Sequence, residues 1–480
     1  MSDTTVTTTE GVLRGTVAGT VRRFFSVPYA APPLGAGRFA PPAPREPWTG
    51  VLDATRPGPT APQPRRDGFG ALDMSPYFGP GWIRGEDFLT VDIRSPVGAV
   101  DCPVMVFVHG GGFVAGSARA PIYDGSAFAR DGVVLVTVQY RLGVSGFLDL
   151  PGAPRNRGVL DVVAALGWVG RNIAAFGGDP GNVTLFGQSA GATIVGAVIA
   201  SEAAAGLFRR AIVQSGNGFG AFSPEQGARV TRAAAAALAV TPTVSGFASV
   251  SDADLVGVVS ALHGLDLRTS TDFDPLLGLS PFGLVAESQP AQSWSSAVDL
   301  LIGTNTEEGN LYLVPQGEPA SSTAADVRAI AARAHPDPDR VVAAYRAQHP
   351  DATFGALRAA ILGDALFGTG SRRAAAAHGN AFVYEFAWRS EALGGALGAA
   401  HAVELPFVFD CLRLPGLHGP GGLLGPAEAP ARLATEMHTA WVRFARTGDP
   451  GWPRFRHGAH VRRFGGDAPA RRRATGNGRA

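Results

Sequence analysis

Short apolar runs alternate along the chain with segments whose apolar residues recur at helical spacing. The runs are rich in β-branched and aromatic residues, which is typical of buried strands, and they cover 104–109, 133–139, 183–186, 211–214, 298–303 and 382–386. An apolar stripe predicts a helix over 159–176, and residues 192–200 are apolar nearly all round, which predicts a buried helix. Strands that alternate with helices predict an α/β fold with a mostly parallel sheet and helices on both faces.

Four other segments depart from this alternation. Residues 11–30 alternate more loosely and predict an antiparallel edge of the sheet, whereas the Pro- and Gly-rich residues 55–85 predict a loop. Two Ala-rich segments, 217–297 and 315–375, predict helical insertions above the sheet.

The length and composition are those of a large globular chain. It has 480 residues, of which 45% are hydrophobic and 17% charged, so we expect a sizeable core and little disorder. We expect one domain over 1–464 that carries the two insertions, followed by a disordered tail over 465–480, where Gly, Ala and Arg predominate. No stretch reaches about 18 uninterrupted apolar residues, so no membrane span is expected.

The basic residues narrow the possible chemistry. All 41 of them are arginine, because the sequence contains no lysine. This excludes a Schiff base to a carbonyl cofactor, the lysine of a nucleotide-binding P-loop, and the Ser-x-x-Lys machinery of serine β-lactamases. The net charge is only +1 and no basic patch dominates, so nucleic acid is not an expected partner.

The cysteines and the N-terminus give expectations about cofactors and compartment. Cys102 and Cys411 lie far apart in the sequence, so neither a disulfide framework nor a Cys-rich zinc site is expected. No cluster of His, Asp and Glu has metal-ligand spacing, and we expect no metal and no cofactor. The polar, Thr-rich start shows no signal peptide, which predicts a cytoplasmic protein. The sequence leaves the oligomeric state open.

A G-x-S-x-G pattern at 187–191 is the first candidate for chemistry. By composition alone such a pattern is common. Its context strengthens it, because an apolar strand (VTLF) precedes it and an apolar helix (ATIVGAVIA) follows it. A nucleophile elbow needs this strand–turn–helix arrangement, which strains the serine backbone and places the serine at a helix N-terminus. The pattern therefore predicts Ser189 as a nucleophile. The alternative is a Gly-rich turn with an inert serine.

A second glycine-rich segment, HGGGF at 109–113, follows the apolar strand VMVFV. Acyl transfer develops a negatively charged oxygen, and backbone N–H groups stabilise it best where no Cβ obstructs its approach. The three glycines therefore predict an oxyanion hole. The alternative is a flexible loop that reverses the chain direction.

Further motifs extend this pattern over most of the chain. They are EGVLRG, VPYAAPPLGAGRF, GEDFLTVDI, NRGVLDVVAALGWVGRNIAAFGGDPGNVTLFGQSAGA and GLFRRAIVQSG, and later LLIGTNTEEGNLY, YEFAWRSEALGGALGAAHAVELPFVF and MHTAWVRFARTGDPGWPRF. Together they resemble the type-B carboxylesterases, the branch that contains bacterial para-nitrobenzyl esterases and the cholinesterases. The match is dense from about residue 11 to 216 and loose over the middle helices. The resemblance implies the α/β-hydrolase fold and ester hydrolysis.

The resemblance also implies roles for individual residues. The family's triad falls on Ser189 as nucleophile, Glu308 as acid and His401 as base, and its oxyanion donors fall on Gly111, Gly112 and Ala190. From its own surroundings, His401 lies in a loop of small residues, and loops of this kind commonly deliver catalytic groups. It would take the Ser189 proton and pass it to the leaving alcohol, while Glu308 holds its tautomer.

Other matching positions are implied to support the triad or the fold. Gln188 stands where glutamate is commoner in the family, next to the nucleophile, and Ser215 matches a serine placed close to the acid. Glu86 and Arg141 match a pair that implies a buried ion pair, with Arg38 nearby.

The expected function is that of a serine carboxylesterase. It would hydrolyse short- to medium-chain or aryl esters through an acyl-enzyme on Ser189, with a small-molecule ester as its partner. Two alternatives stay open. One is carbamate or amide hydrolysis with the same triad, because the choice of leaving group lies in the pocket. The other is a catalytically inactive binding relative, a kind of protein that usually lacks the nucleophile.

Overall fold

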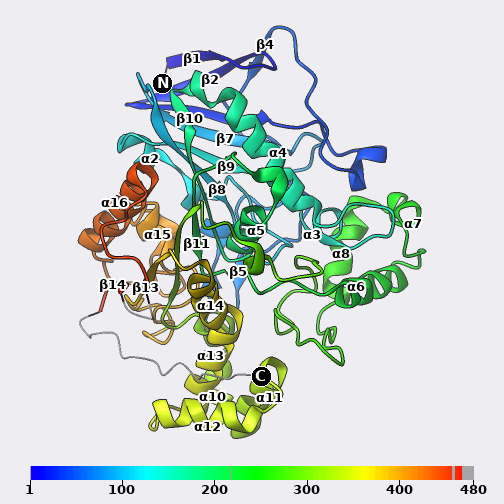
Figure 1. Cartoon of the computed structure of the whole chain (residues 1–480), viewed down its shortest axis with the longest axis vertical. Coiled ribbons are helices and arrows are strands. Elements are labelled where there is room, and N and C mark those ends of the chain that lie inside the picture. The colour runs from blue at the N-terminus through cyan, green and yellow to red at the C-terminus, as the bar shows by residue number, and fades with distance from the viewer. Residues whose placement is uncertain (1, 217, 457–459, 467–480) are drawn as a thin grey trace.

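A mixed β-sheet runs through the centre of the molecule (Figure 1). The computed structural model describes residues 2–216, 218–456 and 460–466. Within them the sheet has twelve strands in the order β1-β2-β3-β7-β9-β8-β10-β11-β12-β13-β14, with β4 beside β2. The strands are β1 (Ser2–Thr7), β2 (Val12–Ala18), β3 (Val21–Pro28), β4 (Val51–Asp53), β7 (Thr90–Pro96), β8 (Cys102–Val108), β9 (Val134–Val138), β10 (Gly178–Gln188), β11 (Arg210–Gln214), β12 (Asp299–Asn305), β13 (Phe382–Phe386) and β14 (Val461–Phe464). The short strands β5 (Gly68–Phe69) and β6 (Leu72–Asp73) pair separately.

The direction of the strands divides the sheet into two parts. From β9 through β14 every neighbouring pair is parallel. The pairs β1–β2, β2–β3, β3–β7 and β7–β9 are antiparallel. The mostly parallel sheet and the antiparallel edge over 11–30 are therefore both confirmed.

Helices cover the two faces of the sheet (Figure 1). The helices that follow strands of the parallel part are α2 (Ser126–Arg130), α3 (Gly143–Phe147), α4 (Arg157–Asn172), α5 (Ala190–Ile199), α15 (Leu405–Val408) and α16 (Ala431–Thr447). Helices on both faces of the sheet explain why strand β8 is a continuous apolar run. Val104 and Val106 pack in the core cluster that contains residues of α4 and α5, whereas Met105 and Phe107 pack in the cluster of α2 and α16. Since both faces are covered, positions 104–108 of the strand are all buried.

The helix predicted over 159–176 is α4, extended by a 3-10 turn at Ile173–Phe176. Among the described residues, the combined stretch Arg157–Phe176 is the one helix long and apolar enough to cross a membrane, with a mean hydropathy of 1.4. Its Val162 and Leu166 are fully buried in the core cluster that lies over the sheet. Core packing therefore accounts for its apolar character.

Two long excursions leave the sheet where the sequence predicts insertions. Between β11 and β12 the chain forms α6 (Pro224–Ala237), α7 (Val244–Ala248) and α8 (Asp252–Ala261). Between β12 and β13 it forms α9 (Asn310–Leu313), α10 (Glu318–Ser321), α11 (Ala324–Ala334), α12 (Pro338–Gln348), α13 (Phe354–Gly363) and α14 (Thr369–His378), with a π-helical turn at Asp364–Gly368. The predicted loop over 55–85 contains only β5, β6 and the single-turn helix α1 (Ser75–Phe78). Residues 467–480 lie outside the described residues, so the disordered tail stays a prediction, as does the single domain.

The expected ion pair between Glu86 and Arg141 is wrong. Arg141 is fully buried and pairs with Asp161 of α4, at 2.7 Å between Nη2 and Oδ1, while Glu86 is exposed. Arg38 does lie nearby, because its carbonyl oxygen accepts a hydrogen bond from Arg141 Nη1 at 3.2 Å. Asp161 supplies a carboxylate within bidentate reach from the adjacent helix, which offsets the cost of burying the Arg141 guanidinium.

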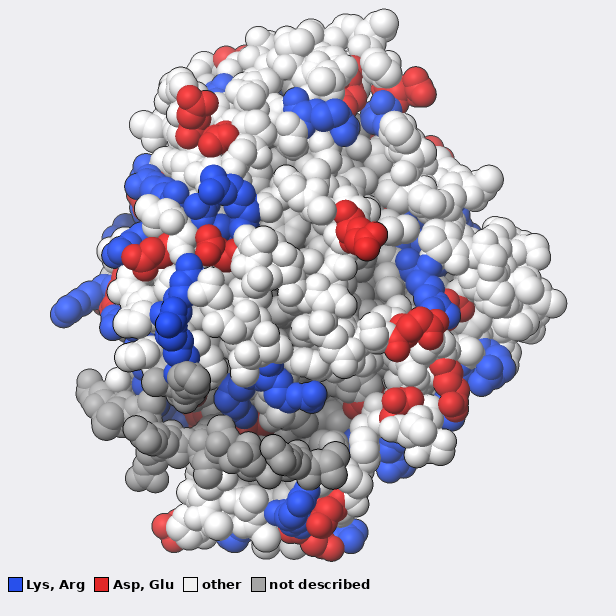
Figure 2. Space-filling view, viewed as in Figure 1, with Lys and Arg blue, Asp and Glu red and all other residues white. Residues whose placement is uncertain are grey.

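The surface carries both signs of charge. Arginine and acidic side chains lie intermixed over the face shown in Figure 2. This distribution agrees with a net charge of +1.

Candidate active site

Ser189 occupies a sharp turn between β10 and α5. Its φ of 58° and ψ of −128° lie outside the regions that side-chain-bearing residues ordinarily adopt. The turn is possible because glycines flank it. A Cβ on Gly191 would lie 2.1 Å from the carbonyl oxygen of Val108, and a Cβ on Gly187 would lie 2.7 Å from the Gly191 carbonyl group. The G-x-S-x-G pattern therefore has the strand–turn–helix geometry that the sequence predicts.

His401 and Glu308 form a buried pair. Their shortest contact is 2.6 Å, between His401 Nδ1 and Glu308 Oε2. The other carboxylate oxygen, Oε1, accepts hydrogen bonds from Ser215 Oγ at 2.6 Å and from the Asn305 backbone N–H at 2.7 Å. These bonds fix the carboxylate, which in turn orients the imidazole and leaves its Nε2 facing the pocket.

The sheet brings these residues together. Ser189 follows β10, Ser215 follows β11, Glu308 lies just beyond β12, and His401 lies in the loop beyond β13. These four strands are neighbours and parallel, so their carboxyl ends meet at one edge. Sites in open α/β sheets form at this edge.

Gln188 contacts the imidazole directly. Its amide Nε2 lies 3.2 Å from His401 Nε2, and the side chain is buried. With the Nδ1 proton directed at Glu308, Nε2 of the neutral imidazole is an acceptor, so the Gln188 amide donates to it. Among the described residues, no hydrogen bond joins Ser189 Oγ to His401.

The glycine loop after β8 lies beside Ser189. Gly111 has a φ of +118° and Gly112 a φ of +65°, both in regions that favour glycine. A Cβ on Gly111 would lie 1.9 Å from the Ala115 carbonyl oxygen. No described residue accepts a hydrogen bond from the backbone N–H of Gly111, Gly112 or Ala190. The three groups line the same pocket as Ser189 and His401 and have the free donors that an oxyanion needs.

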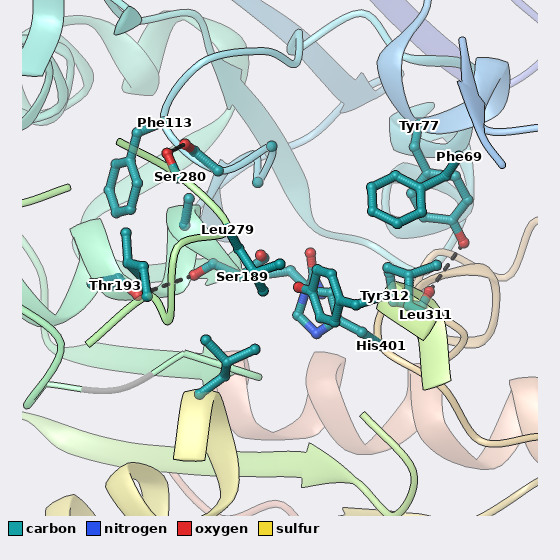
Figure 3. Close-up of a pocket in the computed structure, with 18 of the residues that line it drawn as sticks. Phe69, Tyr77, Phe113, Ser189, Thr193, Leu279, Ser280, Leu311, Tyr312 and His401 are labelled. Carbon is teal, nitrogen blue, oxygen red and sulfur yellow. Dashed lines mark hydrogen bonds between the residues drawn. The ribbon is translucent and has the colours of Figure 1, made fainter. Parts of the chain in front are cut away.

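The pocket around Ser189 has an apolar, largely aromatic wall. Figure 3 shows Ser189 and His401 between two ends of this pocket, with Phe69 and Tyr77 at one end and Phe113, Thr193 and Ser280 at the other, while Leu279 lies next to Ser189 in this view. Both excursions contribute to it, through Leu279 and Ser280 of the first and through Leu366 and Phe367 of the second.

Comparison with known proteins agrees with this geometry. Residues 2–459 match the model of the carboxylesterase family. The chain belongs to the carboxylesterase family. It is 34% identical over 475 residues to the para-nitrobenzyl esterase of Bacillus subtilis (strain 168), an alignment that covers 95% of this chain and 93% of that protein. It is also 34% identical to the phenmedipham hydrolase of Pseudarthrobacter oxydans, over 94% of this chain and 92% of that protein.

The fold of this carboxylesterase is shared with solved relatives. The crystal structure of a carboxylesterase from Geobacillus stearothermophilus superimposes with a TM-score of 0.80 at 34% sequence identity, over 96% of each chain. The expected α/β-hydrolase fold and ester-hydrolase activity are therefore confirmed.

Three residues of the carboxylesterase site were not predicted from the sequence. Phe367 stacks on the His401 ring, with centroids 4.4 Å apart and planes 12° apart, and Tyr312 lies 5.8 Å from the same ring. Phe367 comes from the part of the second excursion where the resemblance is loose, whereas Tyr312 is the last residue of the matching segment LLIGTNTEEGNLY. Arg66 comes from the Pro- and Gly-rich loop over 55–85, which carries no pattern that marks it.

Glu404 is a further buried acid behind the His401–Glu308 pair. Asn305 Nδ2 donates to its Oε2 at 2.7 Å, and Gln214 Nε2 donates to its Oε1 at 3.3 Å. Burial, together with the nearby charge of Glu308, raises the pKa of Glu404 to about 7. Its place three residues after His401, within the matching segment YEFAWRSEALGGALGAAHAVELPFVF, is the signal that could have identified it.

Proposed function

We propose that Ser189, His401 and Glu308 form the catalytic triad of this carboxylesterase. The observation that carries the proposal is the 2.6 Å contact between His401 Nδ1 and Glu308 Oε2, at the edge of a pocket that also contains the strained Ser189. A base oriented by a buried carboxylate, in the same pocket as a serine hydroxyl, is the arrangement that activates a serine nucleophile.

The reaction proceeds through two proton transfers at His401 Nε2. Ser189 Oγ attacks the ester carbonyl carbon as its proton passes to Nε2, and the C–O bond to the alcohol then breaks as Nε2 returns that proton to the leaving oxygen. Water repeats the sequence on the acyl-enzyme and releases the acid. For the first transfer, the Ser189 hydroxyl replaces Gln188 at the Nε2 lone pair. Ser215 and Gln188 act as positioning residues that hold Glu308 and His401.

The N–H groups of Gly111, Gly112 and Ala190 stabilise the negative oxygen of each tetrahedral intermediate. Ala190 is the first residue of α5, so the positive end of that helix adds to the field. Losing one such donor typically costs about 100- to 1,000-fold in kcat.

The aromatic wall of the pocket favours short- to medium-chain or aryl esters. One relative is named phenmedipham hydrolase, which favours carbamate hydrolysis as the second candidate function. A set of para-nitrophenyl esters of increasing chain length, with a matched carbamate and anilide, separates the two: the ester proposal requires the highest kcat/KM on the esters.

Ser189→Ala tests the triad. Because the nucleophile is lost, kcat should fall by roughly 10⁴-fold or more, and labelling by a fluorophosphonate should disappear. Ser249→Ala removes an exposed serine and is the control, in which kcat and labelling by the fluorophosphonate should stay at parental values. Activity of Ser189→Ala within tenfold of the parent would refute the assignment.

A further inference from the structure

Arg66 lies inside the pocket beside the glycine loop. Its Nη1 donates to the Gly111 carbonyl oxygen at 3.4 Å, which is a long hydrogen bond. A Cβ on Gly112 would lie 3.6 Å from the same nitrogen. The guanidinium packs on two aromatic rings, with Cζ 5.3 Å from the Phe69 centroid and 5.2 Å from that of Phe78. The positive charge is therefore held within a few ångströms of the atoms that surround the scissile bond.

No carboxylate of the described residues pairs with Arg66. The described residues that line the pocket include no Asp or Glu, and Arg66 is the one among them with a permanent charge. Burial lowers the pKa of Arg66, but a guanidinium stays protonated in proteins. Of its five N–H donors, only the weak bond to Gly111 uses an acceptor among the described residues. By contrast, the fully buried Arg141 is matched by Asp161.

Arg66 is half-buried in the pocket, and a partly desolvated cation without a counter-charge favours a ligand that supplies one. We propose that Arg66 binds a negative charge on the substrate, so that this carboxylesterase prefers esters that carry a carboxylate near the scissile bond. The planar guanidinium offers paired N–H donors that match a carboxylate. The proposal rests on Ser189 being the nucleophile of the same pocket.

The ring contacts indicate which half of the ester carries the charge. Phe69, on which Arg66 packs, contacts Tyr312 with centroids 6.0 Å apart, and Tyr312 in turn lies 5.8 Å from His401. His401 delivers the proton to the leaving alcohol, so the alcohol half of the ester extends toward this side. The geometry favours a carboxylate on the alcohol half over one on the acyl half.

Two matched pairs of substrates test the proposal and locate the charge. Phenyl acetate and 3-carboxyphenyl acetate differ by a charge on the alcohol half, and ethyl pentanoate and ethyl hydrogen glutarate differ by a charge on the acyl half. Each kcat/KM is measured for the parent and for Arg66→Gln. The expected result for Arg66→Gln is a loss of roughly 10- to 100-fold in kcat/KM for 3-carboxyphenyl acetate, with phenyl acetate nearly unchanged, since hydrogen bonds to charged groups have this strength. A loss confined to ethyl hydrogen glutarate would overturn the placement of the charge on the alcohol half.

The neighbouring arginine provides the control variant. Arg65 is largely exposed and pairs with Asp67, so Arg65→Gln removes the same charge one residue away but outside the pocket. It should leave both substrate pairs at parental values. If Arg66→Gln does not fold, Arg66→Met keeps the packing on the two rings, and competitive inhibition of the parent by benzoate against benzamide provides a measurement without any variant.

The outcomes separate this proposal from the triad assignment. Equal losses for neutral and charged esters in Arg66→Gln, or equal inhibition of the parent by benzoate and benzamide, would show that Arg66 only packs, and would overturn the proposal. Loss of all ester hydrolysis in Ser189→Ala, with the charge preference of the parent intact, supports both. A parent that hydrolyses none of the four esters contradicts the proposed function itself.

Discussion

Replacing Gln188 by glutamate places a carboxylate against the catalytic imidazole. In the parent, the Gln188 amide donates to His401 Nε2 at 3.2 Å, which favours the neutral imidazole because the imidazolium has no lone pair there to accept the bond. A carboxylate at the same place accepts a hydrogen bond from the protonated Nε2 and favours the imidazolium. The base that must be neutral to accept the Ser189 proton therefore becomes neutral only at higher pH. Gln188→Glu should shift the acid-side inflection of kcat/KM upward.

The distance sets the size of the shift. Unit charges 3.2 Å apart attract each other by about 5 kcal/mol at an effective dielectric constant of 20. This figure is an upper bound, because the new carboxylate must also lose water at a position that is only 3% exposed. Opposite charges at this range commonly move titrations by about 1 to 2 pH units, which is about 1.4 to 2.7 kcal/mol.

The assay is a pH–rate profile on one neutral ester, from pH 4.5 to 9. The inflection of kcat/KM reports the free enzyme, and that of the variant belongs to the coupled imidazole and carboxylate. Gln188→Met is the matched control, because the methionine side chain has a similar length and no charge. The inflection of kcat/KM should move much less in this variant than in Gln188→Glu. The Glu404→Gln background removes the buried carboxyl group whose pKa is raised to about 7, so that its titration does not enter the profile. An inflection of Gln188→Glu equal to the parent's, or below it, would show that position 188 does not interact with the imidazolium.

Three further predictions follow from the same contacts. Glu308→Gln should lower kcat by roughly 10³- to 10⁴-fold, whereas Glu307→Gln should lower it far less, because the Glu307 carboxylate faces Arg389 and the Ala399 N–H; equal losses in steady-state assays would refute the distinction. The raised pKa of Glu404 means that its stabilising contribution is complete below pH 4.5 and is lost as the pH rises through about 7. Urea unfolding at pH 4.5 and pH 8 measures the free energy of unfolding of the parent and of Glu404→Gln. Between these two pH values, that of the variant should rise by about 3 kcal/mol relative to that of the parent, and no such rise would contradict the prediction. EDTA should leave turnover unchanged, and so should thiol reagents, because burial raises the pKa of Cys411 to about 12; inhibition by either reagent would contradict the prediction.

The sequence predicted the features that depend on local pattern. The turn at Ser189 is fixed by glycines within two residues of it, and the strands of the parallel part are continuous apolar runs, so both could be identified without tertiary information. The positions of Glu308 and His401 came from the family resemblance. Their meeting depends on the parallel alignment of β12 and β13, which no spacing in the sequence expresses.

The features that the sequence did not predict are contacts between distant segments. Arg141 pairs with Asp161 rather than Glu86, because α4 packs its buried carboxylate against the end of β9, while Glu86 stays at the surface. Phe367 reaches the His401 ring from the π-helical turn of the second excursion. Such partners are chosen by packing of whole elements, whereas hydrophobic periodicity reports only which face of an element is buried.

The charged and polar groups around Ser189 favour a negatively charged substrate. The described lining residues offer Arg66 as a cation and Gln188 as a neutral amide, and the negative charge of Glu308 faces the far side of His401. A carboxylate at position 188 would add a negative charge to this lining and repel an anionic substrate. The neutral amide avoids this repulsion. The neutral amide at position 188 and an arginine without a carboxylate partner among the described residues therefore both leave the pocket able to accept negative charge brought by the substrate.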